Sequence, residues 1–194
     1  AQAMSAVGLI RISGKDSIAI ANKLFPAKDL EKVDGYTLHY GDFVKNHKVL
    51  DQILLSLFRG PKSFTGEDVV ELSFHGSLYI LQEALECIID AGARMAEPGE
   101  FSMRAYLNGQ MDLSQTEAVA DLISSSSAAA HKLAMHQLKG GYSEMINELR
   151  ERLIKFASLI ELELDFTEED VEFANRDELL QLIDEIENLS LIHI

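Results

Sequence analysis

The sequence changes character in the stretch 98-PGEFSMRAYLNGQMDLSQTEAVADL-122. It opens with a Pro-Gly turn and continues as a short amphipathic segment. This segment is expected to end in a turn at Asn108-Gly109, because both residues tolerate a positive φ. A helix then restarts, and Ser114 followed three residues later by Glu117 predicts a capping box at its start. We expect mixed strands and helices before this stretch and helices alone after it.

The residues before this stretch predict a domain of strands and helices. Short runs rich in β-branched and aromatic residues, bounded by Gly, Pro or Asn turns, predict about five strands, at residues 6–12, 36–44, 49–58, 69–74 and 93–96. Apolar residues at helical spacing predict helices at 16–25 and 78–91. We therefore expect an α+β fold, a small mixed sheet with packed helices, in a first domain of residues 1–110.

The residues after this stretch predict an all-α domain of residues 111–194. Its helices are expected at 113–124, 128–139, 142–164 and 177–191. The SSSSAAA tract at 124–130 is expected to cap or kink consecutive helices rather than to form a flexible linker. The acidic loop at 165–175 lacks the alternating Asp/Asn and Gly of a calcium loop, and we predict no metal site.

Composition argues against several classes of protein. The formal net charge of -15 disfavours a broad nucleic-acid or anionic-membrane surface, because either requires clustered Lys and Arg. No window approaches the roughly 20 consecutive apolar residues of a membrane span, and no signal segment opens the chain. Cys87 is the single cysteine, and its apolar helical setting predicts a small buried side chain rather than a nucleophile. We expect a cytoplasmic protein with no membrane attachment, and a fragment of a longer chain.

Two charged residues are placed in otherwise apolar strands. Arg11 lies on the opposite strand face from Ile10 and Ile12, and from the strand alone it is either a solvent-exposed edge residue or a ligand contact. Glu71 lies in the middle of the strand at 69–74, where an unpaired carboxylate is costly. We therefore expect Glu71 to have a partner, and Arg11 is a candidate.

The remaining candidates are weaker. His75 follows the strand at 69–74 and is expected to be a hydrogen-bonded turn histidine, because no second ligand stands at metal-binding spacing around it. Ser63 and Thr65 are expected to fix their loop, because no base is paired with them in sequence.

Together, four segments resemble the tRNA modification GTPases of the MnmE (TrmE) family. They occur in the same order and at the same spacing, and they read GLIRISG at 8–14, GPKSFTGEDVVELSFHG at 60–76, PGEFSMRAYLNGQMDLSQTEAVADLI at 98–123, and ELELDF and EEDVEF in the tail at 161–173. The resemblance covers nearly the whole chain. Each segment alone is modest, and the four together are specific.

The resemblance implies a multidomain protein. It implies an N-terminal folate-binding domain that forms a homodimer and is similar to the tetrahydrofolate site of aminomethyltransferases, and then a helical domain into which a GTPase domain is inserted. The family acts with a flavoprotein partner, MnmG (GidA), on carbon 5 of the wobble uridine of certain tRNAs. It hydrolyses GTP with magnesium and potassium, and the GTPase cycle is coupled to the modification.

Carried over residue by residue, the family's folate contacts fall on Arg11, Glu71 and Gln110. The expected ligand is 5-formyltetrahydrofolate or a related reduced folate. A carboxylate such as Glu71 suits the amide and amino edge of the pterin, and cationic or donor groups at 11 and 110 suit the glutamate or formyl oxygens.

Three departures from the family pattern affect these expectations. Gln110 stands where the family commonly has lysine, and it can donate a hydrogen bond but carries no charge. Ser77 replaces the second glycine of the usual His-Gly-Gly. The 194 residues contain neither a GxxxxGK[ST] phosphate loop nor the family's C-terminal cysteine motif, so we expect no GTP hydrolysis by this polypeptide alone.

Two alternatives stay open from the sequence. A free-standing folate-dependent one-carbon transferase would need a catalytic acid or nucleophile beside the folate, and the candidates Glu71, His75 and Asp112 form no convincing pair in sequence. A purely architectural dimerisation module would fit the uncharged Gln110 and the acidic helices. Turnover with an amine acceptor would favour the first alternative, and dimerisation without folate binding the second.

Overall fold

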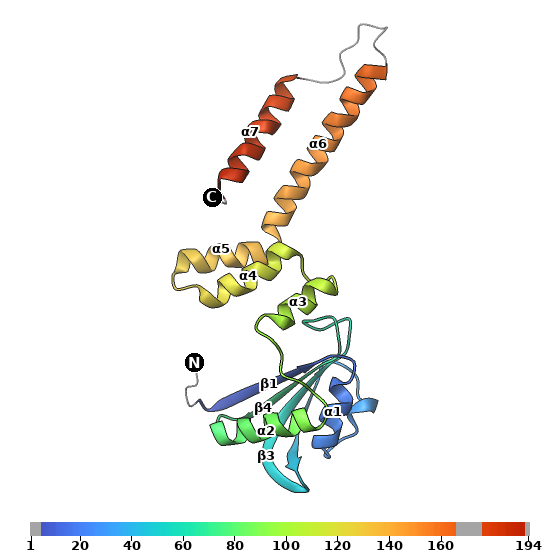
Figure 1. The fold of residues 1–194 in the computed structure, drawn as a ribbon, viewed down its shortest axis with the longest axis vertical. Helices are drawn as coiled ribbons and strands as arrows, with labels where there is room; N and C mark the ends of the chain where they lie inside the picture. The colour runs from blue at the N-terminus through green and yellow to red at the C-terminus, as the bar shows by residue number, and fades with distance from the viewer. Residues whose placement is uncertain (1–4, 166–175, 193–194) are drawn as a thin grey trace. The chain divides into compact units, whose positions relative to one another are not determined.

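The computed structural model describes residues 5–165 and 176–192. Most of the predicted acidic loop, residues 166–175, lies outside the described residues. The chain divides into two compact units, one up to Thr116 and one from Glu117 onward. Each unit is described by itself (Figure 1).

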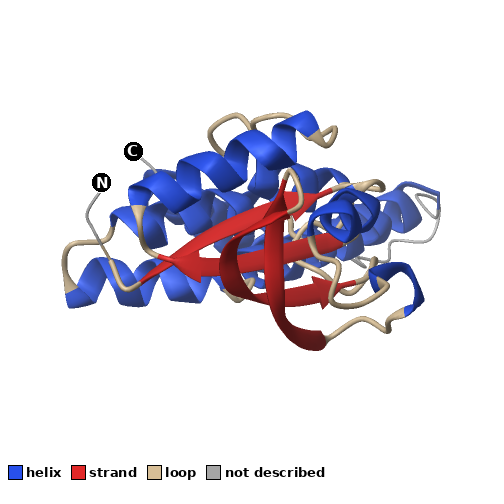
Figure 2. Cartoon of the chain, turned by 90° about the horizontal axis from the view of Figure 1, so that it is seen from below, coloured by secondary structure: helices blue, strands red, loops and turns tan. Residues whose placement is uncertain are grey.

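The first unit is built on an antiparallel sheet. Its strands lie in the order β1-β4-β3-β2, and they are β1 Val7–Ser13, β2 Thr37–Lys45, β3 Lys48–Phe58 and β4 Val69–His75. All three pairings are antiparallel, and Figure 2 shows the twist of the sheet. β1 is an edge strand and pairs with β4 in the interior of the sheet, so residues of β1 and β4 lie opposite each other.

One face of the sheet carries the core of this unit. Val70, Leu72 and Phe74 alternate along β4 and are at most 2% exposed, as expected when one side of a strand is buried. Helices α1 Ser17–Leu24 and α2 Leu78–Asp90 pack on this face. Between α1 and β2 lies a short 3-10 helix, Leu30–Lys32. The α+β expectation is confirmed.

The strand predicted at residues 93–96 is wrong. The backbone N–H of Ala93 bonds to the carbonyl of Ile88 at the end of α2, and the Arg94 side chain donates to the carbonyl of Met95. Within the described residues, the segment 93–97 is loop and joins no sheet. The residue types of this segment do not specify a pairing partner, and the described sheet has four strands instead of about five.

The stretch at 98–122 contains two helices, α3 Glu100–Leu107 and α4 Leu113–Ser124. The break at Asn108-Gly109 is confirmed, because Asn108 caps α3 and Gly109 has a φ of 69°. The predicted capping box is wrong by two residues. The box is formed by Asp112 and Gln115 rather than by Ser114 and Glu117. The backbone N–H of Asp112 donates to the side chain of Gln115, and the backbone N–H of Gln115 donates to the side chain of Asp112, each at 2.9 Å.

The second unit contains the rest of α4 and three further described helices, α5 Ala128–Leu138, α6 Gly141–Asp165 and α7 Arg176–Ile192. Ser127 caps α5 by accepting from the N–H of Ala130, which confirms the expected role of the serine tract. Leu149, Phe156 and Leu182 form the buried cluster between α6 and α7.

None of the described helices is both long enough and apolar enough to cross a membrane.

Candidate functional site

Arg11 and Glu71 form an ion pair on the sheet face that the core helices leave open. The two residues are directly opposite in the β1–β4 register. Nε and Nη2 of Arg11 lie 2.7 and 2.5 Å from the same oxygen, Oε1 of Glu71. The expected partnership is therefore confirmed. Among the described residues, no hydrogen bond is made to the second oxygen, Oε2, so Glu71 keeps an acceptor for a further donor.

Two aromatic rings hold the Arg11 guanidinium in place. Its carbon lies 5.5 Å from the ring centre of Phe64 and 5.7 Å from that of Phe101, distances typical of cation–π contacts. Phe64 comes from the loop before β4 and Phe101 from the first turn of α3. The orientation of Arg11 is therefore set by three elements besides its own strand.

An open cavity of about 520 Å³, which we call the aromatic cavity, is linked to this pair through Phe64, which contacts Arg11 and lines the cavity. Its lining includes the rings of Tyr36, Phe58 and Phe64, together with Lys62 and Gln110. Tyr36 and Phe58 meet edge to face, with ring centres 5.6 Å apart and planes at 86°. Such rings offer a flat ligand both faces and edges for stacking.

Tyr36 is held in an unusual backbone conformation. Its φ is 61°, in the left-handed region that non-glycine residues rarely adopt. Its N–H bonds to the carbonyl of Leu57 at 2.7 Å, which fixes this geometry at the start of β2. The ring is 66% exposed, so burial does not account for the strain. Residues held in strained backbone conformations concentrate at ligand sites.

The turn at Asn108-Gly109 brings Gln110 to the aromatic cavity. The Asn108 amide donates to the carbonyl of Thr65 at 2.7 Å, which ties the turn to the loop before β4. The Gln110 side chain lies against Gly66, where an added Cβ would come within 3.1 Å of it. Gly66 also has a φ of 76°, so this position suits glycine on two counts.

A network of charged side chains fixes α3 against the loop before β4. Arg104 donates from Nη1 to Glu67 at 2.9 Å and from Nη2 to Glu100 at 2.8 Å. Arg94 donates to Glu100 as well, at 2.9 Å. The bonds from Arg94, from the backbone N–H of Glu97 and from Arg104 lower the pKa of Glu100 to about 2. Sequence reasoning noted neither the Glu67–Arg104 nor the Arg94–Glu100 pair.

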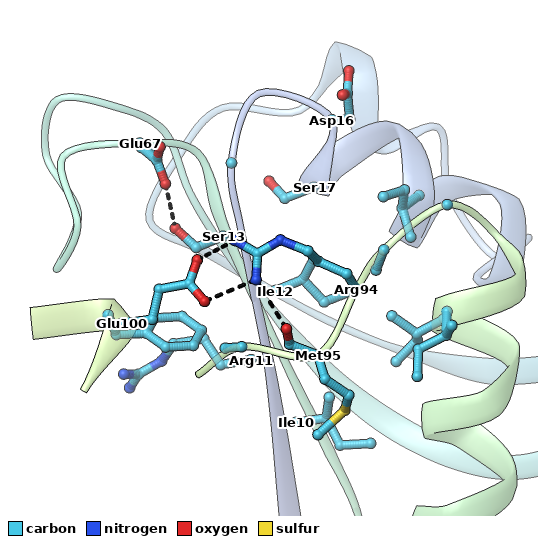
Figure 3. Close-up of a pocket in the computed structure, with 18 of the residues that line it drawn as sticks. Ile10, Arg11, Ile12, Ser13, Asp16, Ser17, Glu67, Arg94, Met95 and Glu100 are labelled. Atoms are coloured by element: carbon cyan, nitrogen blue, oxygen red, sulfur yellow. Dashed lines mark hydrogen bonds and ion pairs between the residues drawn. The ribbon is translucent and has the colours of Figure 1, made fainter. Parts of the chain in front are cut away.

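A second and larger cavity of about 570 Å³ lies at the free edge of β1. Its apolar floor includes Ile10 and Ile12, and the segment 92–96 borders it. Figure 3 shows Arg94 reaching across to Glu100 and to the carbonyl of Met95, and Glu67 accepting from Ser13. The carboxylates of Glu67 and Glu100 in this cavity are therefore engaged by protein donors.

The other candidates behave as structural residues. His75 Nδ1 lies 2.7 Å from Oδ1 of Asp51, and the His75 N–H donates to the same carboxylate, which confirms a hydrogen-bonded histidine. At about 3.4 Å per residue, His75 lies some 14 Å along β4 from Glu71, outside reach of it. Ser63 and Thr65 bond within their loop and to Ser13, as expected.

Cys87 is a buried free thiol in α2, and burial raises its pKa, as suits a core side chain. Within the part of the chain that the structure describes, no group of three or more His, Cys, Asp or Glu could hold a metal ion.

The structure brings the three carried-over residues to one region without joining them in one cavity. Arg11 lines the large cavity, Gln110 lines the aromatic cavity, and Glu71 lines neither. Phe64 connects them, since its ring contacts Arg11 and also lines the aromatic cavity. Phe58 lies opposite Val69 in the β3–β4 register, so it is a diagonal neighbour of Glu71 on the same sheet face, about 7–8 Å away.

Comparison with known proteins gives the family. The family model for the GTP-binding protein TrmE N-terminus matches residues 1–110, and that for the MnmE helical domain matches residues 113–190. The chain belongs to the MnmE (TrmE) family.

Relatives of this family are similar over nearly the whole chain. A protein named tRNA modification GTPase MnmE from Cytophaga hutchinsonii is 52% identical over 194 residues, 99% of this chain and 42% of the relative. Proteins of the same name from Bacteroides thetaiotaomicron and Flavobacterium johnsoniae are 54% identical over 97% and 94% of this chain, which is 42% and 40% of each relative. The chain thus spans about two fifths of their length.

Proposed function

We propose that the first unit binds a reduced folate, such as 5-formyltetrahydrofolate, at the aromatic cavity. The observation that carries the proposal is the exposed Tyr36, whose backbone is left-handed and whose ring lines the cavity with Phe58 and Phe64. Phe58 is a diagonal neighbour of Glu71, whose Oε2 accepts no hydrogen bond among the described residues. The pyrimidine ring of a reduced pterin is flat and aromatic, and it presents an amide and an amino group along one edge. The residues present fit such a ligand.

Each polar residue has a role in this proposal. Oε2 of Glu71 accepts from the pterin amide and amino edge, while Oε1 stays with Arg11. Arg11 keeps Glu71 oriented, because its guanidinium is fixed by two rings. The amide of Gln110 serves the oxygen-bearing part of the ligand. When bound, the folate would supply a one-carbon unit.

The activity of the parent protein is proposed from the family. We propose that the chain is part of a GTP-hydrolysing tRNA modification enzyme that acts with the MnmG (GidA) flavoprotein on carbon 5 of the wobble uridine. The name of the relatives, tRNA modification GTPase MnmE, supports this assignment. The 194 residues contain no phosphate loop, so GTP, magnesium and potassium would be bound by residues outside this sequence.

Dimerisation is proposed through the open face of the sheet. Leu9, Ser73, Leu54 and Tyr40 form one row across the four strands, and its apolar members are 43 to 66% exposed. An apolar sheet face of this kind is normally covered, and a second copy would cover it symmetrically. Leu54→Glu is expected to yield monomers in sedimentation, and Ile123→Glu, at an exposed apolar position in the second unit, is the matched control. A wild-type monomer would overturn this part of the proposal.

Calorimetric titration with 5-formyltetrahydrofolate tests the binding site. Wild-type chain is expected to bind saturably, and Glu71→Ala to weaken binding at least tenfold, because a charge-assisted hydrogen bond contributes about 1.5–3 kcal/mol. Glu83→Ala is the matched control, since Glu83 also pairs with a cation, Lys45 at 2.6 Å, and its side chain is 25% exposed against 23% for Glu71. Absence of binding, or equal loss in both variants, would contradict the site.

A further inference from the structure

The aromatic cavity has only one charged side chain in its described lining. Gln110 is neutral, and the other lining residues are aromatic, proline or serine, with Lys62 as the exception. A folate carries carboxylates on its glutamate tail. The turn at Gln110 brings no charge to meet them, where the resemblance predicts a lysine.

Lys62 is free to take this role. Its side chain is exposed at the rim, and within the described residues it makes no hydrogen bond or ion pair. By contrast, Arg94 and Arg104, which line the large cavity with Arg11, are both bound to Glu100. An ammonium group on a flexible stem can follow a carboxylate over several positions.

We propose that Lys62 supplies the positive charge that Gln110 lacks, and that it binds the glutamate carboxylates of the reduced folate. The loop before β4 thus takes over a contact that the resemblance assigns to the turn after α3. Lys62 sets specificity for the anionic tail, whereas Glu71 and the aromatic rings bind the pterin. This inference rests on the proposed folate site and adds one residue and one ligand group to it.

The experiment compares two ligands on three proteins. The ligands are 5-formyltetrahydrofolate and tetrahydropterin, which has the same ring system but no glutamate. The proteins are the wild type, Lys62→Met and the control Lys48→Met. Lys48 is also exposed and its side chain makes no hydrogen bond or ion pair within the described residues, but it lies at the far end of β3 from Phe58. We expect Lys62→Met to weaken the folate about five- to twentyfold, as for a partly exposed charge pair, and to leave tetrahydropterin binding within twofold.

Two further results complete the test. Gln110→Lys in the Lys62→Met background is expected to restore most of the folate affinity, because it returns a cation to the same cavity. The loss in Lys62→Met is also expected to shrink as salt is raised from 0.05 to 0.5 M, as screening requires (about 10 Å Debye length at 0.1 M). If the wild type binds folate and Lys62→Met binds it with the same affinity, the inference is wrong while the folate site stands. The same holds if Lys62→Met loses as much affinity for tetrahydropterin as for folate. If the wild type binds neither ligand, the proposed function itself is wrong.

Discussion

The strain at Tyr36 makes a prediction that separates stability from binding. Tyr36→Gly removes a left-handed conformation that costs a non-glycine residue about 1–2 kcal/mol. It also loses the edge contact with Phe58, worth about 0.5–1.5 kcal/mol, and gives the unfolded chain more backbone freedom, worth about 0.5–1 kcal/mol. These terms nearly cancel, so the free energy of unfolding is expected to stay within about 1 kcal/mol of wild type.

Binding is expected to change where stability does not. Loss of one aromatic wall is expected to weaken 5-formyltetrahydrofolate about fivefold, from a ring contact of about 1 kcal/mol. Tyr36→Phe keeps the ring and is expected to bind like wild type. His47→Gly is the matched control, because His47 has nearly the same φ, 63°, but lies in the β2–β3 turn away from the cavity.

The assay is urea unfolding followed by calorimetric titration of the same samples. His47→Gly is expected to be about 0.5 kcal/mol more stable than wild type with unchanged binding, because Asn-Gly is the favoured dipeptide for this turn. A Tyr36→Gly variant that binds with full affinity would refute a ligand role for the ring. A variant destabilised by several kcal/mol would refute the account of strain.

Three further predictions concern the fold of the first unit. The pKa of Glu100 is lowered from 4.5 to about 2, so its ion pairs stabilise the fold above pH 4.5 and this stabilisation is lost as the pH falls toward 2. In acid unfolding, Glu100→Gln is expected to flatten the pH dependence of the unfolding free energy over this range. An unchanged pH profile would contradict this prediction. Leu72→Ala is expected to lower the unfolding free energy by about 2–5 kcal/mol, since this fully buried side chain leaves a cavity in the central strand; a loss under 1 kcal/mol in urea titration would show that the core is looser than described. Cys87 is expected to react with a thiol reagent only after unfolding, because it is buried in α2 with a raised pKa; rapid modification of native protein would show otherwise.

Much of the fold could be predicted because its signals are local. The β-branched and aromatic residues at 69–74 predicted a strand, and β4 spans Val69–His75. The cost of an unpaired carboxylate in mid-strand predicted a partner for Glu71, and the ion pair with Arg11 confirmed it.

Other features depend on pairings between distant segments. The segment 93–96 has strand-like residues, but whether it joins a sheet depends on a neighbour that its own sequence does not specify. The Glu67–Arg104 ion pair joins residues 37 positions apart, and no spacing rule identifies it. At the start of α4, both Asp112 with Gln115 and Ser114 with Glu117 fit the capping pattern, and only the position of the Asn-Gly turn decides between them.

The same limit applies to the candidate site. The resemblance selected Arg11, Glu71 and Gln110, but it gave no reason to consider Tyr36, whose signal is a backbone angle. Lys62 was also missed, because an exposed loop lysine carries no pattern of its own. Its significance comes from sharing a cavity with the neutral Gln110.

The central claim is that a reduced folate occupies the aromatic cavity, and backbone amide NMR tests it most directly. On addition of 5-formyltetrahydrofolate to isotope-labelled protein, the amides of Tyr36, Phe64 and Gln110 are expected to shift in proportion to bound ligand. The amides of residues 92–96, which border the large cavity, are expected to change little. Shifts confined to residues 92–96, or no shifts at saturating ligand, would contradict the account.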